Sequence, residues 1–89
     1  MKKKKGFELR HLLRENVIIS KGKENIDFNK IIVLNESAAY LWEAVGEEEE
    51  FTADSLAALL LKEYDTDPDT ARADAVELMQ RWADAGICE

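Results

Sequence analysis

The sequence predicts an α+β domain in which a three-stranded antiparallel sheet is followed by three helices. In the first third of the chain, apolar residues alternate with polar ones or run unbroken, as in strands. In the remaining two thirds, apolar residues recur at helical spacing between capping residues. The length of 89 residues suits one domain with a single modest core. A sheet this small must bury one face against helices, so the two parts are expected to pack together.

Three segments are expected to be strands. Residues 7–13 alternate apolar and polar side chains until the last two positions, and Val17–Ile19 is a short β-branched run. Turn-forming residues at 21–25 lead into the third segment, residues 26–34, which is apolar at every position from Ile31 to Leu34. An unbroken apolar strand has both faces covered, or has one face that awaits a cover.

Capping residues mark the three helices. The first is expected to begin at the N-cap Asn35 and to end at Gly46, the residue after the C-cap. The second begins after Thr52, and the third opens at Asp67–Pro68 and stops at Gly86. The second and third helices are joined by a short turn, so they form a predicted helix-turn-helix with the strands as a wing. The apolar residues of the first two helices are Ala38, Leu41, Trp42 and Val45, and Leu56, Leu59, Leu60 and Tyr64.

Charge is distributed unevenly within the net charge of −7. Residues 35–89 carry 15 acids and three Lys or Arg, a net charge of −12, whereas residues 6–34 have a net charge of +1. The acidic part repels a phosphate backbone, which favours a partner with basic residues over nucleic acid. Residues 1–6 are interpreted as a basic flexible tail. Because no apolar run approaches the ~20 residues of a membrane span, and no secretory signal is present, we expect a cytoplasmic protein.

Few residues have the chemistry of a catalytic or metal site. The chain has one cysteine, Cys88, and one histidine, His11, which exclude an internal disulfide and a zinc site of three or four nitrogen or sulfur ligands. Cys88 is expected to pack as a small apolar residue, and His11 to lie at the surface or in a packing contact. Paired carboxylates in an apolar setting, a phosphate-binding glycine loop and an activated nucleophile are missing from the sequence. We therefore expect no enzymatic activity, cofactor or metal.

Several segments resemble one known family. Leu34–Glu43 resembles the LNxxAxxxWE signature of PqqD-like proteins. Residues 64–68 are similar to the YxVxP-type junction of the family, with Thr66 where valine is common. Residues 74–82 are similar to its DVxxFLxxL helix, and Gly86–Ile87 to its closing Gly-Leu.

This resemblance, which covers residues 7–89, implies a winged helix-turn-helix fold adapted to peptides. Such a domain is a RiPP recognition element. It binds the leader segment of a ribosomally synthesised precursor peptide and presents it to a modifying enzyme, commonly a radical SAM enzyme. The leader adds as a strand beside the third strand and lies against the third helix. Backbone hydrogen bonds then give affinity and side-chain pockets give selectivity.

Two features of the residues favour the same site. The third strand is apolar on both faces, as expected for a strand that receives a neighbour. The third helix carries one apolar stripe that suffices for the core (Ala71, Ala75, Leu78, Trp82 and Ala85) and a flanking stripe that could floor a groove (Val76, Met79 and Ala83). The predicted peptide-binding residues are Lys30, Ile31, Ile32, Val33, Leu34, Arg72, Ala75, Val76, Met79 and Ala83.

Two other functions fit the predicted fold. Winged helices often read DNA, but in the third helix Arg72, Gln80 and Arg81 are outnumbered by Asp69, Asp74, Glu77 and Asp84, which disfavours DNA. A protein-protein adaptor that binds no precursor peptide stays open, as does an oligomer in which a second copy covers the third strand. Asn35 is interpreted as a helix cap and Trp42 as a core anchor, because both fit the helix pattern.

Overall fold

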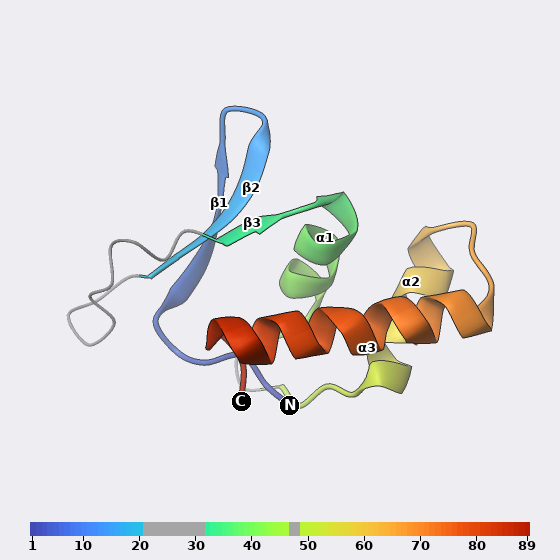
Figure 1. Cartoon of the computed structure of the whole chain (residues 1–89). Coiled ribbons are helices and arrows are strands. Elements are labelled where there is room, and N and C mark those ends of the chain that lie inside the picture. The colour runs from blue at the N-terminus through green and yellow to red at the C-terminus, as the bar shows by residue number, and fades with distance from the viewer. Residues whose placement is uncertain (21–31, 47–48) are drawn as a thin grey trace.

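The structure is a computed structural model that describes residues 1–20, 32–46 and 49–89. Three strands precede three helices, as the sequence predicts (Figure 1). The predicted turn at residues 21–25 and the first part of the predicted third strand, residues 26–31, lie outside the described residues. The elements are β1 (Phe7–Leu12), β2 (Glu15–Ser20), β3 (Ile32–Leu34), α1 (Glu36–Ala44), α2 (Ala53–Glu63) and α3 (Pro68–Ala85).

The sheet is antiparallel with the strand order β1-β2-β3. Its register places Leu9 beside Ile18, and Ile18 beside Ile32. Side chains of residues two apart share a face, so Ile32 and Leu34 lie on the side that packs on the helices. Val33 lies on the opposite side, and 57% of it is exposed. The prediction that this strand is apolar on both faces is therefore confirmed for Ile32–Leu34.

The helices begin at the predicted caps. The Asn35 side chain accepts a hydrogen bond from the backbone amide three residues on, at 2.9 Å. Thr52 and Ser55 form a reciprocal capping box at the start of α2. Asp67 accepts from both the backbone amide and the hydroxyl of Thr70, and these bonds hold the pKa of the Asp67 carboxyl below its usual value. Each cap satisfies amide groups that the first turn of a helix leaves unpaired.

The ends of α1 and α3 differ. Gly86 ends α3 in the left-handed conformation (φ 77°, ψ 20°), as predicted. The helix α1 ends at the C-cap Val45, which is extended (φ −88°, ψ 125°), so Gly46 is the residue after the C-cap, as predicted, but it is not left-handed. The chain has already left the helix at Val45, and the Gly46 amide donates to the Glu49 carboxylate at 2.8 Å.

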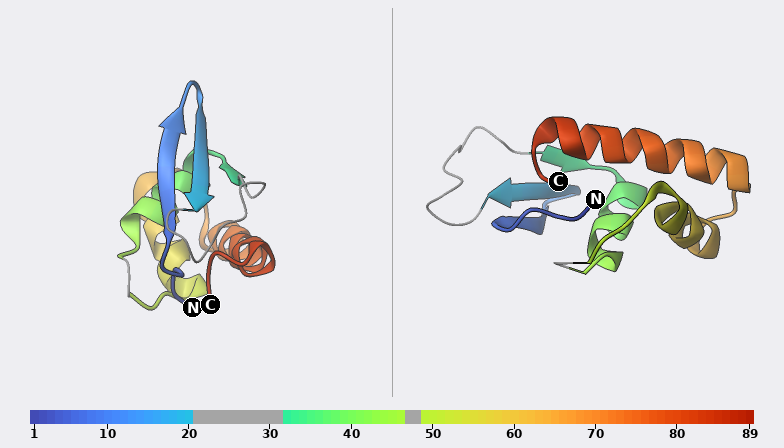
Figure 2. Two further views of the ribbon diagram at one scale, coloured as in Figure 1. Left: turned by 90° about the vertical axis from the view of Figure 1, so that its left-hand side faces the viewer. Right: turned by 90° about the horizontal axis from the view of Figure 1, so that it is seen from below.

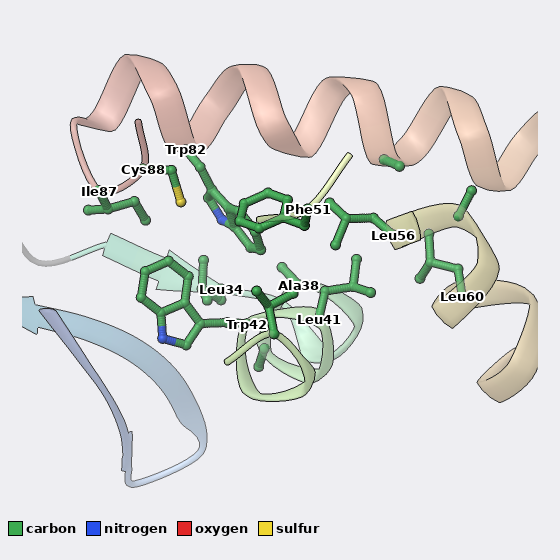
Figure 3. Packing of buried hydrophobic residues seen from close by; sticks show 14 of the residues in the cluster. Leu34, Ala38, Leu41, Trp42, Phe51, Leu56, Leu60, Trp82, Ile87 and Cys88 are labelled. Atoms are coloured by element: carbon green, nitrogen blue, oxygen red, sulfur yellow. The ribbon is translucent and has the colours of Figure 1, made fainter. Parts of the chain in front are cut away.

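One apolar core lies between the sheet and the helices, and Trp82 of α3 is at its centre (Figure 3). Only 1% of Trp82 is exposed. Its ring meets the rings of Trp42 and Phe51 edge-on, with centroids 5.3 and 5.9 Å apart. Ala71 and Ala75 of the predicted core stripe are fully buried, and α3 packs along α2 through this stretch. The core-anchor interpretation of Trp42 is confirmed.

The N-terminal residues pair with the C-terminus, which differs from the solvated tail predicted for residues 1–6. Lys2 exchanges two backbone hydrogen bonds with Glu89, each 2.8 Å long. The Lys3 ammonium donates to the Trp42 carbonyl at 2.9 Å and lies 4.9 Å from the centroid of the Trp42 ring. The backbone amide and carbonyl groups of a lysine-rich segment can still form hydrogen bonds with another segment. Amino-acid composition does not predict that pairing.

Cys88 lies within this pairing of the two ends, opposite Lys3. It is buried, and burial raises the pKa of the Cys88 thiol to about 11. The thiol is therefore protonated and unreactive at neutral pH. The prediction that Cys88 packs as a small apolar residue is confirmed.

The β1–β2 hairpin ends in an unfavourable turn. Leu13 has φ 57°, in the left-handed region where glycine is favoured, and its side chain is fully exposed. The hairpin tip projects away from the helices in Figures 1 and 2. Leu12 pairs with Glu15, so two residues form the turn. Leucine gains no packing here that would offset the cost of its backbone conformation.

We predict that Leu13→Gly raises the free energy of unfolding by about 0.5–1 kcal/mol, because glycine adopts positive φ without steric cost. Urea unfolding followed by circular dichroism measures the change. Leu12→Gly is the matched control, because it places glycine inside β1 and should lower stability. Equal effects of the two substitutions would show that Leu13 is not strained.

We predict that Trp42→Ala lowers the free energy of unfolding by about 3–5 kcal/mol, as for other large aromatic side chains removed from a core. The same unfolding assay measures it. Leu61→Ala, which truncates an exposed apolar residue of α2, is the control and should cost less than about 1 kcal/mol. A loss of only a few tenths for Trp42→Ala would contradict the core position.

Candidate functional site

The outer edge of β3 faces α3 across a groove. Within the described part of the chain, β3 pairs with β2 alone, so its other edge has no strand beside it. In the right-hand view of Figure 2, which is seen from below, β3 and the C-terminal half of α3 lie side by side. A cavity of about 100 Å³ lies between them and is lined by Ile32, Val33, Leu34, Asn35, Ala38, Leu78, Arg81 and Trp82.

The floor of this cavity is apolar and its rim is polar. Leu34, Ala38 and Trp82 are buried and form part of the core. Leu78 is half-buried and packs against that core from α3. Asn35 and Arg81 supply the polar atoms. An apolar floor with a few polar groups is the usual composition of a site that accepts a side chain of a ligand.

A second cavity continues the first along α3. It has a volume of about 270 Å³ and shares Asn35, Leu78 and Arg81 with the first cavity. Asp74 and Glu77 complete its lining. The two cavities together form one trough from the Ile32 end of β3 to the middle of α3, here called the β3–α3 groove.

The arginines of α3 are paired with acids of the chain. Arg81 Nη2 donates to Glu77 Oε1 at 2.6 Å, one helical turn away. Arg72 Nε donates to Asp54 Oδ1 of α2 at 2.9 Å. Asp74 is exposed and forms no ion pair with a cation of the described residues. The polar end of the groove therefore holds two carboxylates and one guanidinium.

The predicted site residues are divided between the groove and other places. Ile32, Val33 and Leu34 line the groove. Ala75 is fully buried in the core, where a ligand cannot reach. Lys30 and Ile31 lie outside the described residues.

The structure does not bring the predicted second stripe of α3 to the groove. At 3.6 residues per turn, Leu78 and Arg81 lie on one side of the core stripe, and Val76 and Ala83 lie on the other. Arg72 shares that other side and pairs with α2. Val76 is 48% exposed and Ala83 is exposed, while Met79 is half-buried against the core.

Sequence reasoning assigned the groove residues outside β3 to other roles. The sequence pattern placed Leu78 and Trp82 in the core stripe and indicated that Asn35 is a helix cap. Arg81 was considered only as a possible DNA-contacting residue. One feature of the sequence could have identified them. Asn35 caps α1 directly after Leu34 of β3, so a residue of α3 that faces Asn35 also lies near the end of β3. The pattern of α3 alone does not show which of its residues take that position.

Comparisons with known proteins agree with this fold. The chain matches the family described as coenzyme PQQ synthesis protein D (PqqD) over residues 15–87. A solved structure described as TbiB1 in complex with the TbiA(beta) leader peptide has a TM-score of 0.75 and 18% sequence identity, and the match covers 100% of this chain and 95% of that chain. This likeness confirms the predicted α+β fold. No curated protein matches the chain.

The described residues also bear on metal binding and on the crossing of a membrane. They contain no group of three or more His, Cys, Asp or Glu side chains arranged to hold a metal ion. Among their helices, none is both long enough and apolar enough to cross a membrane.

Proposed function

The chain belongs to the PqqD family, and on this basis we propose that it is a RiPP recognition element. It binds the leader segment of a ribosomally synthesised precursor peptide in the β3–α3 groove. It then presents the peptide, in the cytoplasm, to a separate modifying enzyme of the radical SAM class. The chain itself catalyses no reaction.

The observation that carries the proposal is the open edge of β3 beside an apolar groove. An unpaired strand edge offers a row of amide and carbonyl groups to another extended chain. A peptide added there would pair its backbone with β3. Every second side chain would point toward the floor formed by Leu34, Leu78 and Trp82. Backbone pairing and side-chain insertion then act together.

The similar structure supports a leader peptide as the ligand. TbiB1 is described in complex with a leader peptide, and its fold matches the whole of this chain. The two proteins therefore share a fold, and we propose a ligand of the same class for this chain. The two sequences are only 18% identical, so we expect the residues that select the peptide to differ between the two proteins.

The positions of the two chemically versatile residues support a binding role. Cys88 is buried with its pKa raised to about 11, so it is a poor nucleophile. His11 lies on the exposed hairpin, where it contacts Asn16 and Glu43. Neither residue lines the groove. The chemistry on the bound peptide is therefore assigned to a separate enzyme.

Amide NMR titration with the leader peptides encoded near the gene tests the proposal. We expect shifts concentrated at residues 32–35 and 74–82. A peptide methylated on the backbone nitrogens that face β3 should bind much more weakly, because it cannot donate to the strand edge. A spectrum that no neighbouring peptide changes would contradict the proposal and favour a protein-protein adaptor.

We predict that Leu78→Ala weakens leader binding by roughly 5- to 30-fold, the equivalent of about 1–2 kcal/mol of lost apolar contact. Isothermal titration calorimetry measures the affinity, and near-UV circular dichroism confirms that the fold is kept. Val76→Ala removes a similar side chain from the opposite side of α3 and should leave affinity unchanged. If Val76→Ala weakens binding more than Leu78→Ala does, the peptide lies on the other side of the helix.

A further inference from the structure

We infer that the β3–α3 groove selects leader peptides that carry Lys or Arg two positions from an apolar anchor residue, with the cation paired to Asp74. This inference rests on the proposed function and specifies the class of peptide that the groove takes. It follows from the charges at the polar end of the groove and from the spacing between that end and the apolar floor.

The charges at the polar end favour a cation. Arg81 lines the groove, but its guanidinium is held by Glu77 at 2.6 Å. Asp74 forms no such ion pair with another of the described residues. Asn35, the remaining polar residue there, is neutral. A bound peptide that brings a positive charge would therefore complete an ion pair, whereas a negative charge would meet two carboxylates.

The charges around the groove add to the negative charge at its polar end. Residues 35–89 have a net charge of −12, and the other arginine of α3, Arg72, is paired with Asp54. Charges further away than about 8 Å are largely screened at physiological salt, so Asp74 and its immediate neighbours decide the preference. The wider negative field would speed the approach of a basic peptide.

The spacing in α3 matches the spacing in a strand. Leu78 on the apolar floor and Asp74 are four residues apart, which is about 6 Å along a helix. Side chains on one face of an extended peptide are two residues apart, which is about 6.6 Å. One peptide side chain can thus enter the floor at Leu78 while the next on the same face reaches Asp74. The two spacings are therefore nearly equal.

Selection from a displayed library of random dodecapeptides tests the inference without knowledge of the natural leader. Wild type, Asp74→Lys and Asp65→Lys are each used as bait. Asp65 lies in the turn between α2 and α3, outside the groove, so its substitution is a matched control for net charge. Only selected peptides that shift the amides of residues 32–35 are analysed, which restricts the result to the groove.

Wild type and Asp65→Lys should enrich Lys or Arg two positions from an apolar residue, and Asp74→Lys should enrich Asp or Glu at that position. Replacing the cation of a selected peptide by Gln should weaken binding to wild type about two- to fivefold and leave binding to Asp74→Asn unchanged. Groove-binding peptides without a charge preference, or with the same preference for all three baits, would overturn the inference alone. Failure to select any groove-binding peptide would overturn the proposed function as well.

Discussion

The edge-on contacts of Trp82 with Trp42 and Phe51 hold α3 against the rest of the domain. Trp82 projects from α3, Trp42 from α1, and Phe51 precedes α2, so one aromatic cluster joins three separate parts of the chain. Trp82 also lines the groove together with Leu34 of β3. The same side chain that completes the core therefore helps to set the distance between α3 and β3.

The pairing of the two chain ends completes this arrangement. Beyond Gly86 the chain turns back, and its last residues pair with Lys2–Lys4 rather than with β3. Ile87 and Cys88 are buried by this return, which secures the C-terminal end of α3 beside the sheet. A strand edge must be either covered or left for a partner. Because the chain ends pair with each other, the edge of β3 stays open within the described residues.

Among the described residues, charged side chains lie at the surface and not in the core. The core that holds the groove contains no buried polar or charged residue within the described residues, so no charge there needs compensation. The ion pairs of α3 lie at the surface, where each contributes little to stability. Charged groups at the surface can contact a ligand without being needed for the stability of the core. The fold thus supplies a strand edge and an apolar floor, and Asp74 and Arg81 are among the residues at the polar end of the groove.

The sequence by itself determined the secondary structure and most of the core. The caps at Asn35 and Asp67 and the buried position of Trp82 were predictable, because capping and helical periodicity depend on residues a few positions apart. Only the tertiary structure decided that Leu78 rather than Val76 faces β3, and that the lysine-rich residues 2–4 pair with residues 87–89. Periodicity defines how wide an apolar face is, but the direction from which β3 approaches that face depends on contacts between distant segments, which no local pattern records.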